Sequence, residues 1–207
     1  MKVKVIEVNG TYPTLFGLGL SYGITSDLKS YTPLLAGTDL YNKLLNIADA
    51  LAHKQRGHNK FLESINIALD ITAPRYWWAE FDTYRVGVTK QSESTIHTLG
   101  KRDLTADDFE HGLPLGTLNT LNNIIDRYRC TENKYEKETL FLALKTTLPE
   151  GFLQRRIVFL NAKTLQNIIA QRINHRLPEW KQFCGILRNS LPFHICSWVF
   201  PEGHTAE

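Results

Sequence analysis

Hydrophobic and polar positions alternate most regularly between residues 65 and 72. The apolar positions are Ile65, Ile67, Leu69 and Ile71, and the intervening ones are Asn66, Ala68, Asp70 and Thr72. Because successive side chains of a β-strand point to opposite faces, this period of two predicts a half-buried strand. One face belongs to the core, and the other is free for chemistry.

A change of period follows this strand. Pro74 suits the first turn of a helix, and apolar residues then recur at helical spacing at Trp77, Phe81, Tyr84 and Val88. We therefore expect a helix that ends near Gly87. The next positions crowd donors and acceptors together, at Thr89, Gln91, Ser92, Glu93, Ser94, Thr95 and His97. A core element would not end this way.

The N-terminal third contains one clear strand and one clear helix. Val3 to Val8 predicts a strand that ends at Asn9-Gly10, and residues 11–37 are interpreted as loop because they are rich in Gly, Ser, Thr and Pro. Thr38 then resembles an N-cap before an apolar stripe. We expect this helix to reach Lys54 and Arg56, with Gly57 at the C′ position, so that it delivers His58 to a defined place.

The second half is predominantly helical. Residues 116–130 and 135–148 have helical patterns, and residues 100–115 read as loop. Residues 157–160 predict a short strand or the approach to a helix, which Asn161 can cap. The apolar side of that helix is Leu165, Ile168, Ile169 and Ile173, its polar side is Lys163, Asn167, Gln171 and Asn174, and Arg172 lies next to the polar side. Two amides and a cation on one face can bind a heterocycle and a phosphate, but solvated helix faces look much the same.

Composition limits the class of protein. The chain has 207 residues with 43% hydrophobic content, which fits one domain with a real core, residues 1–207. The net charge is only +3, from 24 dispersed basic and 21 acidic residues, so we expect no nucleic-acid partner. The start, MKVKVIEV, reads as a strand and not as a signal peptide, and no apolar run is long enough to cross a bilayer. The three cysteines (Cys130, Cys184, Cys196) are not closely paired and suggest free thiols. We therefore expect a soluble cytoplasmic protein.

Searches for common catalytic motifs are mostly negative. Gly17-Leu18-Gly19 lacks the third glycine and acidic partner of a dinucleotide fingerprint, and no phosphate-binding loop ends in Gly-Lys-Ser/Thr. The 7 histidines form no HExxH, so we expect no metal, and there is no Gly-x-Ser-x-Gly elbow. An enzyme built from this chain would take its difficult chemistry from a cofactor.

The order of several weaker motifs resembles the flavin-dependent thymidylate synthases. That family has Gly-His-x-x-x-x-Glu-His, and here the stretch from Gly57 to Ser64 matches it except at its last position. The family signature Arg-His-Arg-x-x-Ser-x-Asn-Glu-x-Ser-x-Arg-Tyr falls on the window from Thr83 to His97, where one leading arginine remains, Arg85. The closing Arg-Tyr is replaced by Ile96-His97 or nearby.

The resemblance continues towards the C-terminus and spans roughly residues 38–185. Asn161-Ala162-Lys163-Thr164-Leu165 resembles the family's Asn-x-Arg-Ser-Leu, in which the Asn and the Arg contact the flavin. Asn167 and Arg172 then match a flavin-contacting Asn and a nucleotide-binding Arg. The usual Gln-Trp-Glu-Ile is blurred here to Leu177-Pro178-Glu179-Trp180.

The resemblance implies a mixed α/β (α+β) fold, with an antiparallel sheet and flanking helices, that assembles as a homotetramer. It implies that FAD is bound at subunit interfaces, that dUMP is methylated to dTMP with methylenetetrahydrofolate, and that NADPH reduces the flavin. Because the reduced flavin supplies hydride, no protein nucleophile is needed. The protein holds the pyrimidine against the flavin and polarises it.

The resemblance also assigns site residues. Those for the cofactor are His58, Glu63, Arg85, Gln91, Asn161, Lys163 and Asn167. Those for the substrate are Arg85, Ser92, Glu93, Ser94, His97 and Arg172, of which Arg172 also serves catalysis. Structural roles compete with these assignments. His58 could satisfy a helix C-terminus, Glu63 could pair with a surface Lys, and residues 92–95 could cap a helix. The aromatic run Tyr76, Trp77, Trp78 and Phe81 reads as core and not as a surface that stacks on flavin.

Two further functions remain open beside thymidylate synthesis. Altered substrate arginines with Asn161 and Asn167 retained would suit a related enzyme that modifies pyrimidine nucleotides, for example by hydroxymethylation. A non-catalytic relative could instead keep the fold as an oligomeric binding protein. Flavin content separates the last from the first two, and product analysis separates those.

Overall fold

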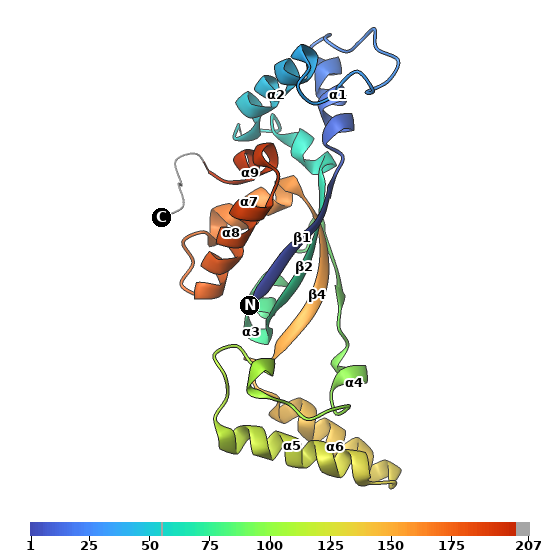
Figure 1. Ribbon diagram of the computed structural model, residues 1–207, viewed down its shortest axis with the longest axis vertical. Coiled ribbons are helices and arrows are strands. Elements are labelled where there is room, and N and C mark those ends of the chain that lie inside the picture. Colours follow the sequence, from blue (N-terminus) through green and yellow to red (C-terminus); the bar gives the residue numbers. More distant parts are fainter. Residues whose placement is uncertain (55, 202–207) are drawn as a thin grey trace. The chain divides into compact units, whose positions relative to one another are not determined.

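A computed structural model describes residues 1–54 and 56–201 of the chain (Figure 1). Its strands form an antiparallel four-stranded sheet in the order β1-β2-β4-β3. The strands are β1 (Lys2–Asn9), β2 (Asn66–Pro74), β3 (Val88–Ser92) and β4 (Leu153–Asn161). Helices flank the sheet, so the predicted fold class is confirmed.

The helices among the described residues are of two kinds. The α-helices are α1 (Thr11–Ser21), α2 (Asp39–Ala52), α3 (Arg75–Phe81), α4 (Thr95–Thr98), α5 (Leu115–Cys130), α6 (Lys134–Thr147), α7 (Ala162–Arg172), α8 (Pro178–Ser190) and α9 (Phe193–Val199). Two short 3₁₀ helices are η1 (Lys60–Ser64) and η2 (Ala106–Asp108). Each of these described helices is too short or too polar to span a bilayer.

The chain divides into two compact units, each made of several segments. Unit 1 comprises Met1–Lys2, Ile71–Thr83 and Gln91–Arg156, and unit 2 comprises Val3–Asp70, Tyr84–Lys90 and the chain from Ile157 onward. All four strands contribute residues to both units. That the chain is one domain stays a prediction.

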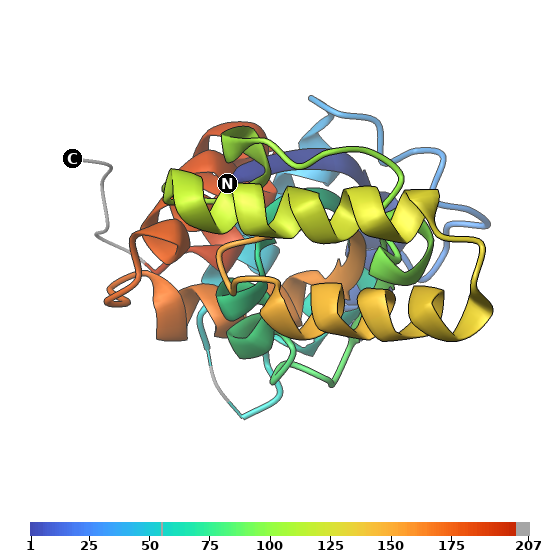
Figure 2. The same ribbon diagram turned by 90° about the horizontal axis from the view of Figure 1, so that it is seen from below.

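Unit 1 is built around a helical hairpin. Helices α5 and α6 lie side by side (Figure 2), joined at Asn133, whose side chain accepts hydrogen bonds from the backbone N–H groups of Tyr135 and Glu136. The hairpin buries a continuous apolar cluster: Leu99, Leu104, Phe109, Leu121, Ile125, Leu144 and Leu148. Both helices have nearly the bounds that the sequence predicts, because each has a regular apolar stripe.

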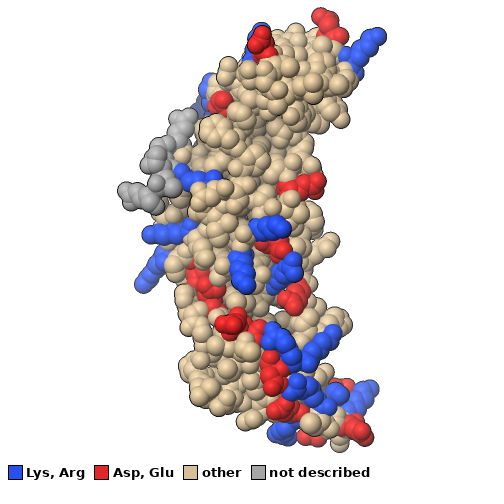
Figure 3. All heavy atoms as spheres, viewed as in Figure 1, with Lys and Arg blue, Asp and Glu red and all other residues tan. Residues whose placement is uncertain are grey.

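Charges of both signs lie on the surface over this hairpin. On the face shown in Figure 3, Lys and Arg lie among Asp and Glu over α5 and α6. Ion pairs join Arg102 to Asp108 and Arg127 to Glu136. Exposed ion pairs of this kind add little to stability, so these charges keep the surface solvated more than they stabilise the fold.

The aromatic residues of α3 form part of the core of unit 1. Trp77, Trp78 and Phe81 are at most 1% exposed. The ring of Phe81 stacks on that of Trp77 with centroids 5.0 Å apart, and Trp78 Nε1 donates to the backbone oxygen of Gln154, 2.9 Å away, on β4. The prediction that this run is core is confirmed for these three residues.

The residues after α3 differ from the prediction. The helix ends at Phe81 and does not continue towards Gly87, and Pro74 is its N-cap. Gly87 adopts φ +69°, which turns the chain into β3, so Val88 begins a strand. The predicted polar cluster is therefore partly a strand, because a local turn overrides the helical spacing of Tyr84 and Val88.

Unit 2 contains a helix where the sequence indicates loop. Residues 11–21 form α1, whose Pro13 lies in the first turn, where its missing N–H is not needed. Gly19 is required for packing, because a Cβ there would lie 2.6 Å from Thr25 Cγ2. Tertiary packing therefore outweighs the low helix propensity of glycine.

Two further boundaries in unit 2 correct the prediction. Helix α2 begins after its predicted N-cap, Thr38, which accepts from Tyr41 N, but it ends at Ala52. Gly57 is not at the C′ position, and its φ of +85° belongs to a separate turn. Helix α8, which contains the motif-like residues Pro178, Glu179 and Trp180, and helix α9 are absent from the prediction.

Candidate functional site

The junction between β4 and α7 holds the first group of predicted cofactor residues. Asn161 is the N-cap of α7, as predicted, and its Oδ1 accepts from Thr164 N at 2.8 Å. Thr164 Oγ1 donates to the backbone oxygen of Val86, 3.1 Å away. The turn that carries the exposed Arg85 is thereby fastened to the N-terminus of α7. The structure thus brings the neighbourhood of Arg85 to Asn161.

Close packing at this junction requires a glycine. A Cβ on Gly87 would lie 2.7 Å from Asn161 Nδ2 and 2.7 Å from Thr164 Oγ1. Real Cβ atoms do not approach so closely, and φ +69° is strained for any other residue. Gly87 therefore allows the turn to lie directly against the side chain of Asn161.

A partly buried amide network fixes the loop that carries His58. Gln166 Nε2 donates to the backbone oxygens of Ala52 and Trp198, at 2.9 and 2.7 Å. Its Oε1 accepts from Asn59 Nδ2 at 3.1 Å and from Lys163 Nζ at 3.3 Å. Gln166 therefore uses both ends of its amide, and it ties Lys163 to the residue beside His58.

A cavity of about 540 Å³ opens next to this loop. Its lining joins η1 and the preceding loop to α1: Gly10, Pro13, Thr14, Gly17, Leu18, Ser21, His58, Lys60, Phe61, Glu63 and Ser64. Two predicted cofactor residues, His58 and Glu63, thus share one cavity, and both are exposed. The volume lies within the usual range for small-molecule sites.

Thr14 gives the cavity a buried polar group. The residue is 8% exposed, and its Oγ1 has no hydrogen-bond partner within the described part of the chain. A buried hydroxyl without a partner is costly, by roughly 1–3 kcal/mol, so its position in a cavity wall is informative. The sequence gives little sign of it, because α1 reads as loop.

Arg172 ends α7 beside two aromatic rings. Its guanidinium lies 4.8 Å from the ring centroid of Trp180 and 5.5 Å from that of Tyr84, and its Nε donates to Tyr84 Oη at 2.8 Å. These contacts hold the cation at one place on the surface of unit 2. Asn167, one turn earlier, accepts from Gln171 Nε2 at 3.1 Å.

The remaining predicted site residues, Gln91 for the cofactor and the others for the substrate, belong to unit 1. Gln91 and Ser92 end β3, and Glu93 follows, with its N–H donating to the backbone oxygen of Arg155 at 2.9 Å. Ser94 is the N-cap of α4, and His97 lies within that helix. Ser94 thus takes the competing capping position, although its side chain makes no cap hydrogen bond. These five residues therefore belong to unit 1. The other seven predicted site residues belong to unit 2: His58, Glu63, Arg85, Asn161, Lys163, Asn167 and Arg172.

The fold of this chain is shared with proteins of known structure. It is the fold of the flavin-dependent thymidylate synthases, which the two solved structures that we compare share with this chain at a TM-score of 0.71. Both are ThyX from Helicobacter pylori, with FAD and dUMP. One is 15% identical, covering 96% of this chain and 97% of its own, and the other is 16% identical, covering 96% and 98%. No protein-family model and no curated protein sequence matches the chain.

Proposed function

We propose that the chain is a flavin-dependent enzyme that methylates dUMP to dTMP. The observation that carries this proposal is the shared fold over 96% of the chain with proteins that were crystallised with FAD and dUMP. Methylenetetrahydrofolate would supply the carbon unit, and NADPH the two electrons that reduce it to a methyl group. Tetrahydrofolate, NADP⁺ and dTMP would leave as products.

The residues of unit 2 fit a flavin nucleotide chemically. The cavity offers a hydroxyl at Thr14, an imidazole at His58 and a carboxylate at Glu63, so it can pair with both donors and acceptors of a ligand. Lys163 adds a cation for a phosphate, although as a point charge and not as a planar fork. FAD, once reduced, would supply the hydride.

The side chains of the protein would bind the nucleotide and orient it towards the flavin. Arg172, held on Trp180, presents a fixed positive charge that can stabilise negative charge on a pyrimidine carbonyl. Arg85 and Ser94 would bind the phosphate end of the nucleotide, and Gln91, Ser92, Glu93 and His97 would complete the substrate and cofactor contacts. No cysteine is required as a nucleophile. Burial raises the pKa of the Cys184 thiol to about 11, which keeps it protonated at neutral pH.

The test of this function is the absorbance spectrum of the purified chain. We expect the chain to carry FAD or to bind it when added, and we expect dUMP to perturb the flavin spectrum. A chain that leaves flavin fluorescence unquenched would contradict the enzyme and favour a non-catalytic binding protein. A response to another pyrimidine nucleotide, but not to dUMP, would favour a related modifying enzyme such as a hydroxymethylase.

The proposal includes a homotetramer that binds FAD at its subunit interfaces, together with a cytoplasmic location. Light scattering should then give a particle of about four chain masses, at 23.7 kDa for each chain. A stable monomer that still binds FAD would show that the site is complete within one chain.

Thr14→Val tests whether the hydroxyl of Thr14 destabilises the free protein and contributes to FAD binding. Without ligand, we expect the free energy of unfolding to rise by about 1 kcal/mol, because a buried unpaired hydroxyl is removed. With FAD present, the variant should gain less stability than the wild-type chain. Urea unfolding with and without FAD measures both effects.

Thr25 provides the matched control. It is fully buried, but its Oγ1 donates to the backbone oxygen of Phe16 at 2.9 Å. Thr25→Val should therefore lower the free energy of unfolding by about 1 kcal/mol. If Thr14→Val and Thr25→Val changed the free energy of unfolding equally, the hydroxyl of Thr14 would not be a group kept unpaired for a ligand.

A further inference from the structure

Tyr84 lies at the centre of a chain of hydrogen bonds along α7. Arg172 Nε donates to Tyr84 Oη at 2.8 Å, and Tyr84 Oη donates to Gln171 Oε1 at 3.1 Å. Gln171 Nε2 then donates to Asn167 Oδ1 at 3.1 Å. Each donor in this chain donates a hydrogen bond to the next residue, so the three hydrogen bonds run in one direction from Arg172 to Asn167.

The two ends of this chain have different predicted ligands. Arg172 is assigned to the nucleotide, and Asn167 is assigned to the flavin. We propose that Tyr84 is a positioning residue that couples nucleotide binding to flavin binding through Gln171. This inference rests on the proposed function, because it needs both ligands.

The contacts of Tyr84 favour a role in coupling the two binding events over a role in packing alone. The hydroxyl of Tyr84 fixes the guanidinium from its Nε side, while the ring of Trp180 supports it at 4.8 Å. At the other end, Asn167 Oδ1 is occupied, so the Nδ2 group is oriented as the donor end of that amide. A ligand that orders either end therefore orders the other, since hydrogen bonds in a chain polarise and align one another.

The aromatic ring and the hydroxyl of Tyr84 can be separated experimentally. The ring meets Trp180 edge to face, with centroids 6.4 Å apart, and this contact survives in Tyr84→Phe. Only the hydroxyl, which carries both hydrogen bonds, is lost. A role in packing alone would leave Tyr84→Phe like the wild-type chain.

The experiment measures the affinity for dUMP with and without saturating FAD, by calorimetry on the full chain. In the wild type we expect FAD to tighten dUMP binding about fivefold or more, within the usual range of coupling between sites. In Tyr84→Phe this ratio should fall to about twofold or less. Gln171→Met, at an exposed position, breaks the same chain one bond further on and should lower the ratio in the same way.

Tyr31→Phe is the control, because Tyr31 is exposed and lies outside the hydrogen-bond chain. The coupling role would be overturned if Tyr84→Phe kept the wild-type ratio of dUMP affinities with and without FAD. It would also be overturned if Tyr31→Phe lowered this ratio as much as Tyr84→Phe does. FAD and dUMP that bind independently in the wild type would also overturn it, while the proposed function would stand. A wild-type chain that binds neither ligand would overturn both.

Discussion

Arg172→Ala should weaken the binding of dUMP ten- to more than a hundredfold. A charge-assisted contact to a carbonyl or phosphate contributes roughly 1.5–3 kcal/mol, and alanine removes it completely. Titration of dUMP into the flavin-loaded protein, followed by the flavin spectrum, measures the loss. Flavin affinity itself should change little, because Arg172 is assigned to the nucleotide.

Arg172→Ala should also have a smaller effect on the stability of the fold. Its guanidinium packs over Trp180 and Tyr84, so alanine should also lower the free energy of unfolding by about 1–2 kcal/mol. Arg172→Lys keeps the charge but loses the planar donor pattern, and should lie between the wild type and alanine in dUMP affinity.

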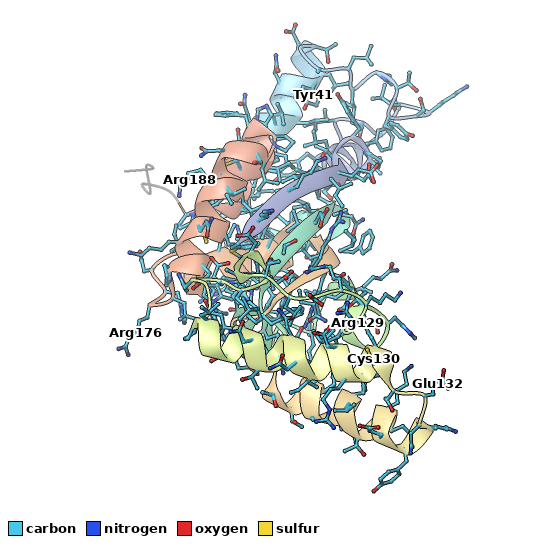
Figure 4. The ribbon with its side chains drawn as sticks, turned by 60° about the horizontal axis from the view of Figure 1, so that its bottom comes forward. Tyr41, Arg129, Cys130, Glu132, Arg176 and Arg188 are labelled. Atoms are coloured by element: carbon cyan, nitrogen blue, oxygen red, sulfur yellow. The ribbon has the colours of Figure 1, made fainter. Side chains whose placement is uncertain are left out.

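Arg176→Ala is the matched control for loss of charge. Arg176 is exposed and points away from the ribbon at the turn between α7 and α8 (Figure 4). It should leave dUMP affinity almost unchanged. Equal dUMP affinity in Arg172→Ala and the wild type would instead make Arg172 a purely structural cation.

Gly87→Ala should both destabilise the fold and weaken FAD binding. A non-glycine residue at φ +69° costs about 1 kcal/mol, and the new Cβ would collide with the side chains of Asn161 and Thr164. Displacing the N-cap of α7 costs roughly 0.5–2 kcal/mol more. We expect a total loss of about 1.5–3 kcal/mol in the free energy of unfolding, measured with urea. FAD affinity should fall at least tenfold, because Asn161 is moved from its place.

Gly185→Ala controls for the general effect of adding a methyl group. Gly185 lies within α8, with open space around its Cα, so alanine should raise the free energy of unfolding by about 0.5–1 kcal/mol. If Gly87→Ala bound FAD as tightly as Gly185→Ala does, Asn161 would not be a flavin contact.

Local signals explain which elements can be predicted from the sequence. Helices α5 and α6 and strand β2 combine an apolar period with suitable ends, so pattern alone places them. Helix α1 contains Pro13, Gly17 and Gly19, which individually indicate loop. It forms because Gly19 lets the helix pack closely on Thr25 and Leu44. No local signal carries that information.

The same limit applies to the candidate site. Motif order makes His58, Asn161 and Arg172 candidates for the site, because their neighbours in sequence share the motif. It does not point to Thr14 or Gln166, because their roles depend on residues far away in the chain. Thr14 lines a cavity together with residues 58–64, and Gln166 donates a hydrogen bond to the backbone oxygen of Trp198. Tyr84 reads as an apolar helix position, whereas its hydroxyl bonds Arg172 and Gln171.

The segmented make-up of the two units restricts how the chain can be divided into fragments. Each unit draws on three separate stretches of the chain, and all four strands begin in one unit and finish in the other. A fragment of residues 71–156 would therefore lack Met1–Lys2 of unit 1 and would include residues 84–90 of unit 2. Neither unit can be produced alone as one uninterrupted stretch of the chain.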